Sequence, residues 1–187
     1  MKNIELILCI FLSLQIIGTH ASEKKKFSTI KIENLSLIKN SNDLFIDGDV
    51  SVILEETLVN ALFKGVSLEF VSEVEVFSPR RFFPDHLYKK KNRAAILTYH
   101  GITRRYTVKV NEEEIYFESL TQGLAKCLGL KNWVSFPEEE IIGRKIRVRL
   151  GLDIDSLPKP LSLVAVSDPA WKMTTGWVEI DSNYEAN

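Results

Sequence analysis

The amino-acid sequence predicts a mainly β fold, namely an antiparallel β-sandwich or a partly closed barrel with two short helices. Most of the chain alternates apolar and polar residues with the two-residue period of a β-strand. Polar breaks separate these stretches as turns separate neighbouring strands, and two segments have helical spacing instead. Strands with one apolar and one polar face are typical of antiparallel sheets that bury one side.

The alternating segments are spread along the chain. The clearest is residues 145–154, where five apolar residues alternate with lysine, arginine, glycine and aspartate without a miss. Residues 44–52 and 68–76 have the same pattern. Residues 106–110 and 115–117 lie on either side of a short polar break and predict a hairpin. We therefore expect antiparallel neighbours.

Two segments have the spacing and the end signals of helices. The first runs from Glu55 to Lys64, places its apolar residues on one face and is followed by Gly65, a common helix stop. The second begins at Ser119, which forms a capping-box pattern with Gln122, and ends at Gly129. Each is expected to cover a sheet edge or the core.

Length and composition indicate one globular domain, residues 22–187. The chain has 187 residues, of which 45% are hydrophobic and 26% charged, as is usual for proteins that fold. Its net charge of −1 gives no reason to expect a polyanionic partner. Without Cys9, which lies in the N-terminal apolar run, Cys127 is the one cysteine left, so we expect no internal disulfide and interpret Cys127 as a buried apolar residue.

Residues 1–21 are interpreted as a signal peptide. Lys2 precedes an apolar run over residues 6–17, and small residues then lead to a cleavage site between Ala21 and Ser22. The run is short for a membrane span. We therefore predict export to the periplasm.

The alternative is an uncleaved N-terminal segment that tethers the protein to the inner membrane. Glu5 weakens the positive start of the signal, and Lys24 to Lys26 follow the cleavage site, where positive charge favours retention in the cytoplasm.

The sequence contains no recognisable catalytic, metal-binding or nucleotide-binding motif, so we expect neither an enzyme nor a cofactor. Two aspartate pairs, Asp47 with Asp49 and Asp153 with Asp155, have a spacing that places both carboxylates on one face of a strand. Such a pair, with His100 nearby, serves acid-base chemistry in some hydrolases. A solvated strand face or turn explains the same residues.

Residues 79–93 have the most distinctive local composition, because basic and aromatic side chains are interleaved there. Such a segment binds phosphates while its rings stack on bases or rest at a lipid interface. An exported protein is not expected to meet nucleic acid, which leaves an anionic membrane surface or another envelope protein. A loop that packs its aromatic rings under the sheet and keeps its lysines in water explains the same composition. The candidate residues are Arg80, Arg81, Phe82, Phe83, Tyr88, Lys89, Lys90, Lys91 and Arg93.

Three groups of residues occur in a characteristic order. They are Gly65-Val66-Ser67-Leu68 with Pro79-Arg80; Tyr99-His100 with Thr103-Arg104 and Tyr106; and Leu157-Pro158-Lys159-Pro160, followed by an alternating strand, with Asp168, Trp171 and Trp177. Together they resemble the bacterial domain-of-unknown-function family 4390 over residues 28–180. The resemblance implies a small exported protein of proteobacteria, without an established activity, cofactor or catalytic residue.

Two local expectations in the C-terminal part are independent of the family. Leu157 to Pro160 predict a rigid extended turn, because both prolines fix their own φ and restrict the residue before them. Trp171 and Trp177 are interpreted as large anchors in the core or at a sheet edge, with a ligand platform as the alternative.

Three functional hypotheses remain. The first is a non-catalytic envelope domain that binds another component through a sheet edge, an aromatic surface or the basic segment. The second is a periplasmic carrier that holds a lipid or other apolar ligand between its sheets. The third is a hydrolase that uses an aspartate pair.

Overall fold

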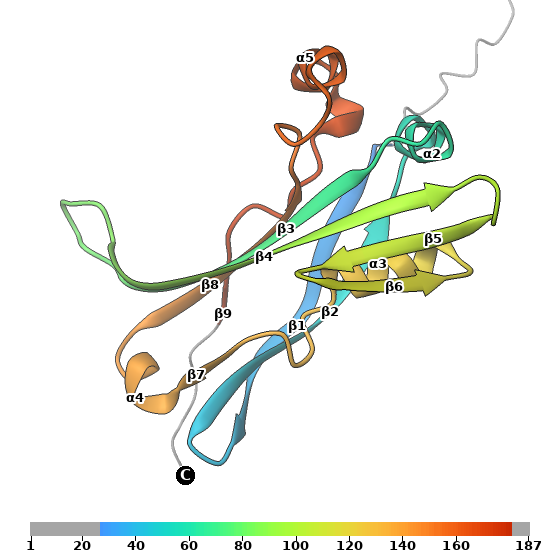
Figure 1. The fold of residues 1–187 in the computed structure, drawn as a ribbon. Coiled ribbons are helices and arrows are strands. Elements are labelled where there is room, and N and C mark those ends of the chain that lie inside the picture. Colours follow the sequence, from blue (N-terminus) through green and yellow to red (C-terminus); the bar gives the residue numbers. More distant parts are fainter. Residues whose placement is uncertain (1–26, 181–187) are drawn as a thin grey trace, which may run out of the picture.

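A computed structural model describes residues 27–180, so the predicted signal peptide and its cleavage site at Ala21 and Ser22 lie outside the described residues. Two antiparallel sheets form a mainly β, sandwich-like fold, which confirms the predicted fold class (Figure 1). The sheets do not close into a barrel over residues 27–180. The strands are β1 (Thr29–Asn40), β2 (Asp43–Ile53), β3 (Leu68–Ser78), β4 (His86–His100), β5 (Arg105–Val110), β6 (Glu113–Phe117), β7 (Ser135–Pro137), β8 (Lys145–Leu152) and β9 (Val178–Ile180). The helices are α2 (Glu56–Phe63), α3 (Leu120–Leu128), α4 (Glu138–Ile141), α5 (Lys159–Ser167) and the 3-10 turn η2 (Pro169–Trp171).

The larger sheet has six strands in the order β6-β5-β4-β3-β8-β9. Its central strand β3 pairs with β4 on one side and with β8 on the other, and all pairs are antiparallel. The alternation predicted for β8 sets this register, because Ile146 and Val148 lie opposite Val76 and Val74 on the same buried face. The hairpin predicted after Tyr106 is formed by β5 and β6.

The smaller sheet has three strands in the order β1-β2-β7, and it packs with α3 against the buried face of the larger sheet. The core contains apolar residues from both sheets and from α3. Helix α3 lies close to β4 because Gly123 has no side chain. A Cβ atom at this position would lie 2.9 Å from Cδ1 of Leu97.

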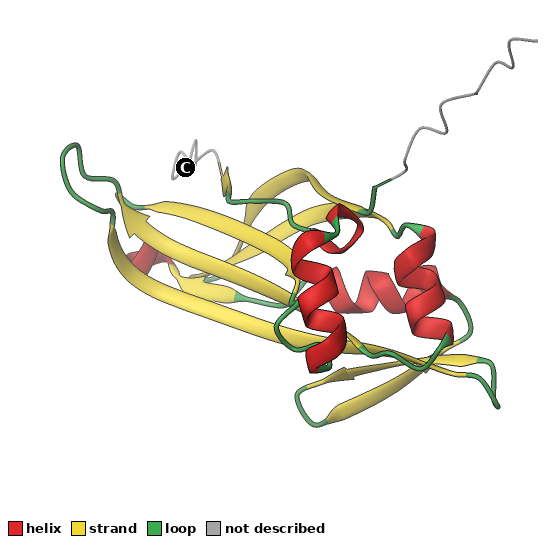
Figure 2. Cartoon of the chain, turned by 90° about the horizontal axis from the view of Figure 1, so that it is seen from above, coloured by secondary structure: helices red, strands yellow, loops and turns green. Residues whose placement is uncertain are grey.

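Both predicted helices are present with the expected ends. Glu55 caps α2 by accepting a hydrogen bond from the backbone N–H of Thr57, and Gly65 follows the helix with a φ of 86°. The Ser119 hydroxyl caps α3 by accepting the backbone N–H of Gln122 at 3.3 Å. Figure 2 shows that α2, α3 and α5 gather at one end of the molecule, whereas α4 lies apart from them.

The strand expected after Leu157 to Pro160 is wrong: Pro158 is extended, with a ψ of 137°, but helix α5 begins at the next residue. Pro160 lies in the first turn of the helix, where its fixed φ suits the helix and its missing N–H removes no helical hydrogen bond. Leu157 and Ala165 are buried, so tertiary packing stabilises a segment whose valine-rich composition favours a strand. The short helix α4 was likewise not predicted.

Candidate binding surface

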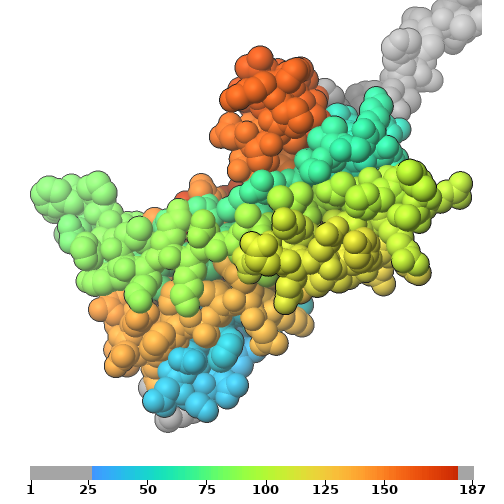
Figure 3. All heavy atoms as spheres, in the orientation of Figure 1, coloured from blue at the N-terminus to red at the C-terminus, as the bar shows by residue number. Residues whose placement is uncertain are grey.

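The hairpin formed by β3 and β4 projects beyond the rest of the molecule (Figures 1 and 3). The strands remain paired as far as Ser78 and His86, and a loop of residues 79–85 joins them. Pro79 and Pro84 stiffen the two ends of this loop, because each ring fixes the backbone φ. We call residues 79–85 the hairpin tip. All residues of the tip are exposed.

Two phenylalanines at the tip are among the most exposed large apolar residues that the structure describes. The exposed fraction is 83% for Phe82 and 73% for Phe83. Isolated exposed apolar residues are ordinary, but adjacent aromatic rings at the end of a projecting hairpin are far from any core that would bury them. The expectation that these rings pack under the sheet is therefore wrong.

The tip also carries positive charge. Arg80 and Arg81 are exposed, and within residues 27–180 neither forms an ion pair, although the Arg81 guanidinium lies 5.6 Å from the centre of the Phe82 ring. The one acidic residue of the tip, Asp85, forms an ion pair with Arg147 at 3.1 Å, so its charge is directed back toward β8. The outer part of the tip is therefore cationic and aromatic.

The other basic residues of the predicted segment do not lie in a loop, which corrects the single basic loop expected from the sequence. Lys89, Lys90, Lys91 and Arg93 belong to strand β4, and successive side chains of a strand point to opposite faces. Lys89 forms an ion pair with Glu140 of α4 at 2.9 Å. Lys91, two residues along on the same face, donates a hydrogen bond of 2.6 Å to the backbone oxygen of Ser135.

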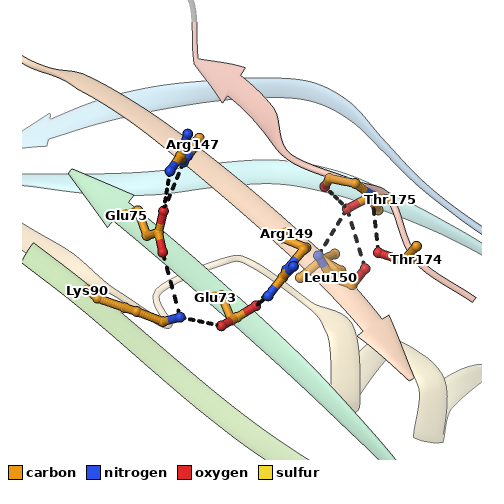
Figure 4. Close-up of polar contacts among 9 residues, drawn as sticks. Glu73, Glu75, Lys90, Arg147, Arg149, Leu150, Thr174 and Thr175 are labelled. Atoms are coloured by element: carbon orange, nitrogen blue, oxygen red, sulfur yellow. Dashed lines mark hydrogen bonds and ion pairs between the residues drawn. The ribbon is translucent and has the colours of Figure 1, made fainter. Parts of the chain in front are cut away.

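Lys90 points to the opposite face and joins a ladder of charges across three strands (Figure 4). Its Nζ atom lies 2.7 Å from Glu73 and 3.6 Å from Glu75, while Arg147 and Arg149 of β8 bind the same two glutamates from the other side. Burial raises the pKa of Glu73, but hydrogen bonds from Lys90 and Arg149 outweigh it and hold that pKa below the usual value. Asp85 also pairs with Arg147, so the three cations of the ladder meet three carboxylates. The ladder was not predicted, although the alternating pairs Glu73/Glu75 and Arg147/Arg149 are its signal in the sequence.

Arg93 is a structural residue. Its Nη2 atom donates hydrogen bonds to the backbone oxygens of Cys127 at 3.1 Å and Gly129 at 2.8 Å, where α3 ends. Its guanidinium also lies 4.7 Å from the centre of the Trp133 ring. Burial lowers the pKa of Arg93 and raises the pKa of the Cys127 thiol to about 12. Cys127 is fully buried, as expected from the sequence.

Tyr88 lies on β4 near the base of the tip. The residue is about half exposed, and the guanidinium of Arg144 lies 4.1 Å from the centre of its ring. The imidazole of His86 meets the same ring edge to face, with 4.5 Å between ring centres. These contacts hold Tyr88 against the protein, so it belongs to the base of the hairpin and not to the exposed tip.

Two of the candidate catalytic residues make contacts with neighbouring backbone groups. Asp47 accepts the backbone N–H of the next residue, and Asp153 accepts the backbone N–H of Asp155, as in a turn. Asp49 and His100 are exposed. Among residues 27–180, no group of three or more histidine, cysteine, aspartate or glutamate side chains is arranged to hold a metal ion.

The two tryptophans have different environments. Trp171 is buried in the core, as predicted for a large anchor. Trp177 lies on the outer face of the larger sheet, where the guanidinium groups of Arg147 and Arg149 lie 4.8 and 4.7 Å from its ring centre. Its ring thus packs on the arginines of the charge ladder.

A family model with the description "Domain of unknown function (DUF4390)" matches residues 28–181. The chain belongs to this family. The match confirms the resemblance found in the sequence, which covers nearly the same residues. The DUF4390 description states no activity. Searches of curated proteins and of solved structures found no match. In the described part of this DUF4390 chain, no helix combines the length and the apolar composition that crossing a bilayer requires.

Proposed function

We propose that this DUF4390 protein is a non-catalytic binding domain of the cell envelope that attaches to another envelope component through the hairpin tip. Export is inferred from the N-terminal residues, which have the order of a signal peptide. The observation that carries the proposal is the composition of the tip. Phe82 and Phe83 are exposed beside Arg80 and Arg81, whose charges have no acidic partner within residues 27–180.

The contrast between the tip and strand β4 supports this choice of site. Lys89 and Lys90 already have acidic partners within the domain, and such charges gain little from a second partner. The tip arginines have none. A partner that covers the rings of Phe82 and Phe83 removes their apolar surface from water. Burying each ring is worth roughly 1.5–3 kcal/mol. Two rings therefore provide about 3–6 kcal/mol toward an association that costs at least about 4 kcal/mol, so attachment also needs the charges of the tip arginines.

Photocross-linking in living cells tests this proposal. A photoreactive amino acid is placed at Phe83 and, as the matched control, at Ile102, which is fully exposed at the turn between β4 and β5. We expect the tip position to yield a defined adduct with one envelope component, protein or lipid, and the control position to yield none. Equal yields from both positions, or no adduct from the tip, would contradict the proposal.

A further inference from the structure

We infer that the component contacted by the hairpin tip is an anionic lipid bilayer. This inference rests on the proposed function and names the chemistry of its partner. It depends on the nature of the four side chains at positions 80–83, on where the hairpin carries them, and on the pairing of the charges around them.

The four side chains suit the polar–apolar boundary of a bilayer. Aromatic rings such as those of Phe82 and Phe83 insert at the level between headgroups and acyl chains. The planar guanidinium groups of Arg80 and Arg81 donate paired hydrogen bonds to phosphate oxygens. Because cation and ring are adjacent in the sequence, one shallow insertion satisfies both.

The location of these residues favours a bilayer over a folded protein partner. The tip is a loop of residues 79–85 at the end of a projecting hairpin (Figure 3). A stable protein interface uses about 20–30 residues on each side, far more than this tip offers. A bilayer needs no complementary shape, since a few rings and cations suffice for reversible attachment.

The surrounding charges direct attraction to the tip. Asp85 is paired with Arg147, and Lys89 with Glu140, so these charges on the flanks of the hairpin are neutralised in place. The whole chain has a net charge of −1, so a general positive charge is not what would attract it to anionic lipid. The attraction is therefore local, and its strength falls as salt screens it.

Vesicle flotation tests the inference with the protein as isolated from cells. One set of vesicles contains equal parts of phosphatidylglycerol and phosphatidylcholine, and the other contains phosphatidylcholine alone. The charge variant is Arg80→Gln with Arg81→Gln. Its matched control is Arg104→Gln with Arg105→Gln, which removes the same charge from two exposed arginines at the β4–β5 turn. All variants share one N-terminus, so their differences report on the tip.

We expect binding to the anionic vesicles that decreases as salt is added. Each arginine near an anionic surface contributes about fivefold, so the charge variant should bind about 25-fold more weakly at low salt. The control pair should stay within about twofold of wild type. Phe82→Ala with Phe83→Ala should weaken binding at least about tenfold, whereas Ile102→Ala should have little effect.

Equal binding to neutral and anionic vesicles, or equal loss from the tip and control pairs, overturns the inference. So does an absence of binding by the wild type. If the tip still forms a protein adduct in cells, the bilayer inference fails and the proposed function stands. If the tip forms no adduct in cells either, both fail.

Discussion

Arg93 provides a demanding test of the division between structural and binding residues. Its sequence context places it in the basic segment, whereas the structure directs its guanidinium to the two backbone oxygens at the end of α3. Replacing Arg93 with alanine removes both hydrogen bonds and the contact with Trp133. We therefore predict a loss of stability without a loss of binding by the tip.

The magnitude follows from these contacts. Hydrogen bonds from a charged donor are worth roughly 1.5–3 kcal/mol each, so two contribute about 3–6 kcal/mol. Burial of the guanidinium offsets part of this, as its lowered pKa indicates. We expect Arg93→Ala to lower the free energy of unfolding by about 3 kcal/mol. The thermal midpoint should then fall by roughly 6–12 °C for a domain of this size.

Urea denaturation of wild type, Arg93→Ala and the exposed control Arg104→Ala measures this difference. The control should change the free energy of unfolding by less than about 0.5 kcal/mol. A change of that size for Arg93→Ala as well would refute the structural role. A folded Arg93→Ala protein that no longer binds vesicles would show that Arg93 takes part in binding.

Three further predictions concern single residues. The pKa of Glu73 is lowered in the folded protein, so the stability it contributes is complete above the usual value of 4.5 and is lost as the pH falls below it. The difference in unfolding free energy between wild type and Glu73→Gln should therefore shrink below pH 4.5, and a constant difference would contradict the ion-pair ladder. Gly65→Ala should cost about 1 kcal/mol in thermal unfolding because φ is 86°, and an unchanged midpoint would exclude backbone strain there. Cys127 is buried with a pKa of about 12, so a thiol reagent at neutral pH should label it only after denaturation. Rapid labelling of the folded protein would show that α3 opens locally.

Alternation predicted the sheets well because burial of one face imposes it directly. Residues 146–152 show this, since a shift of one position would turn Ile146 and Val148 toward water. Helix α5 was not predicted, because no local pattern of this kind marks it. Its burial depends on Leu157 and Ala165 meeting other segments, and local composition does not encode those contacts.

The candidate surface was found by composition and then divided by geometry. The sequence places Lys89, Lys90 and Lys91 beside the tip, but the pleat of β4 sends Lys90 to one face and its neighbours to the other. Glu73 and Glu140, which pair with Lys90 and Lys89, are distant from them in the sequence. These ion pairs therefore could not be predicted from local composition. The tip arginines, Arg80 and Arg81, have no acidic partner within the described residues.

Cross-linking in living cells from two positions of the predicted basic segment tests which part of it is the binding surface. One is Phe82 at the tip, and the other is Asn92, which is exposed on strand β4. We predict an envelope adduct from Phe82 and none from Asn92. An adduct from Asn92 that equals or exceeds the adduct from Phe82 would show that the strand, rather than the tip, is the binding surface.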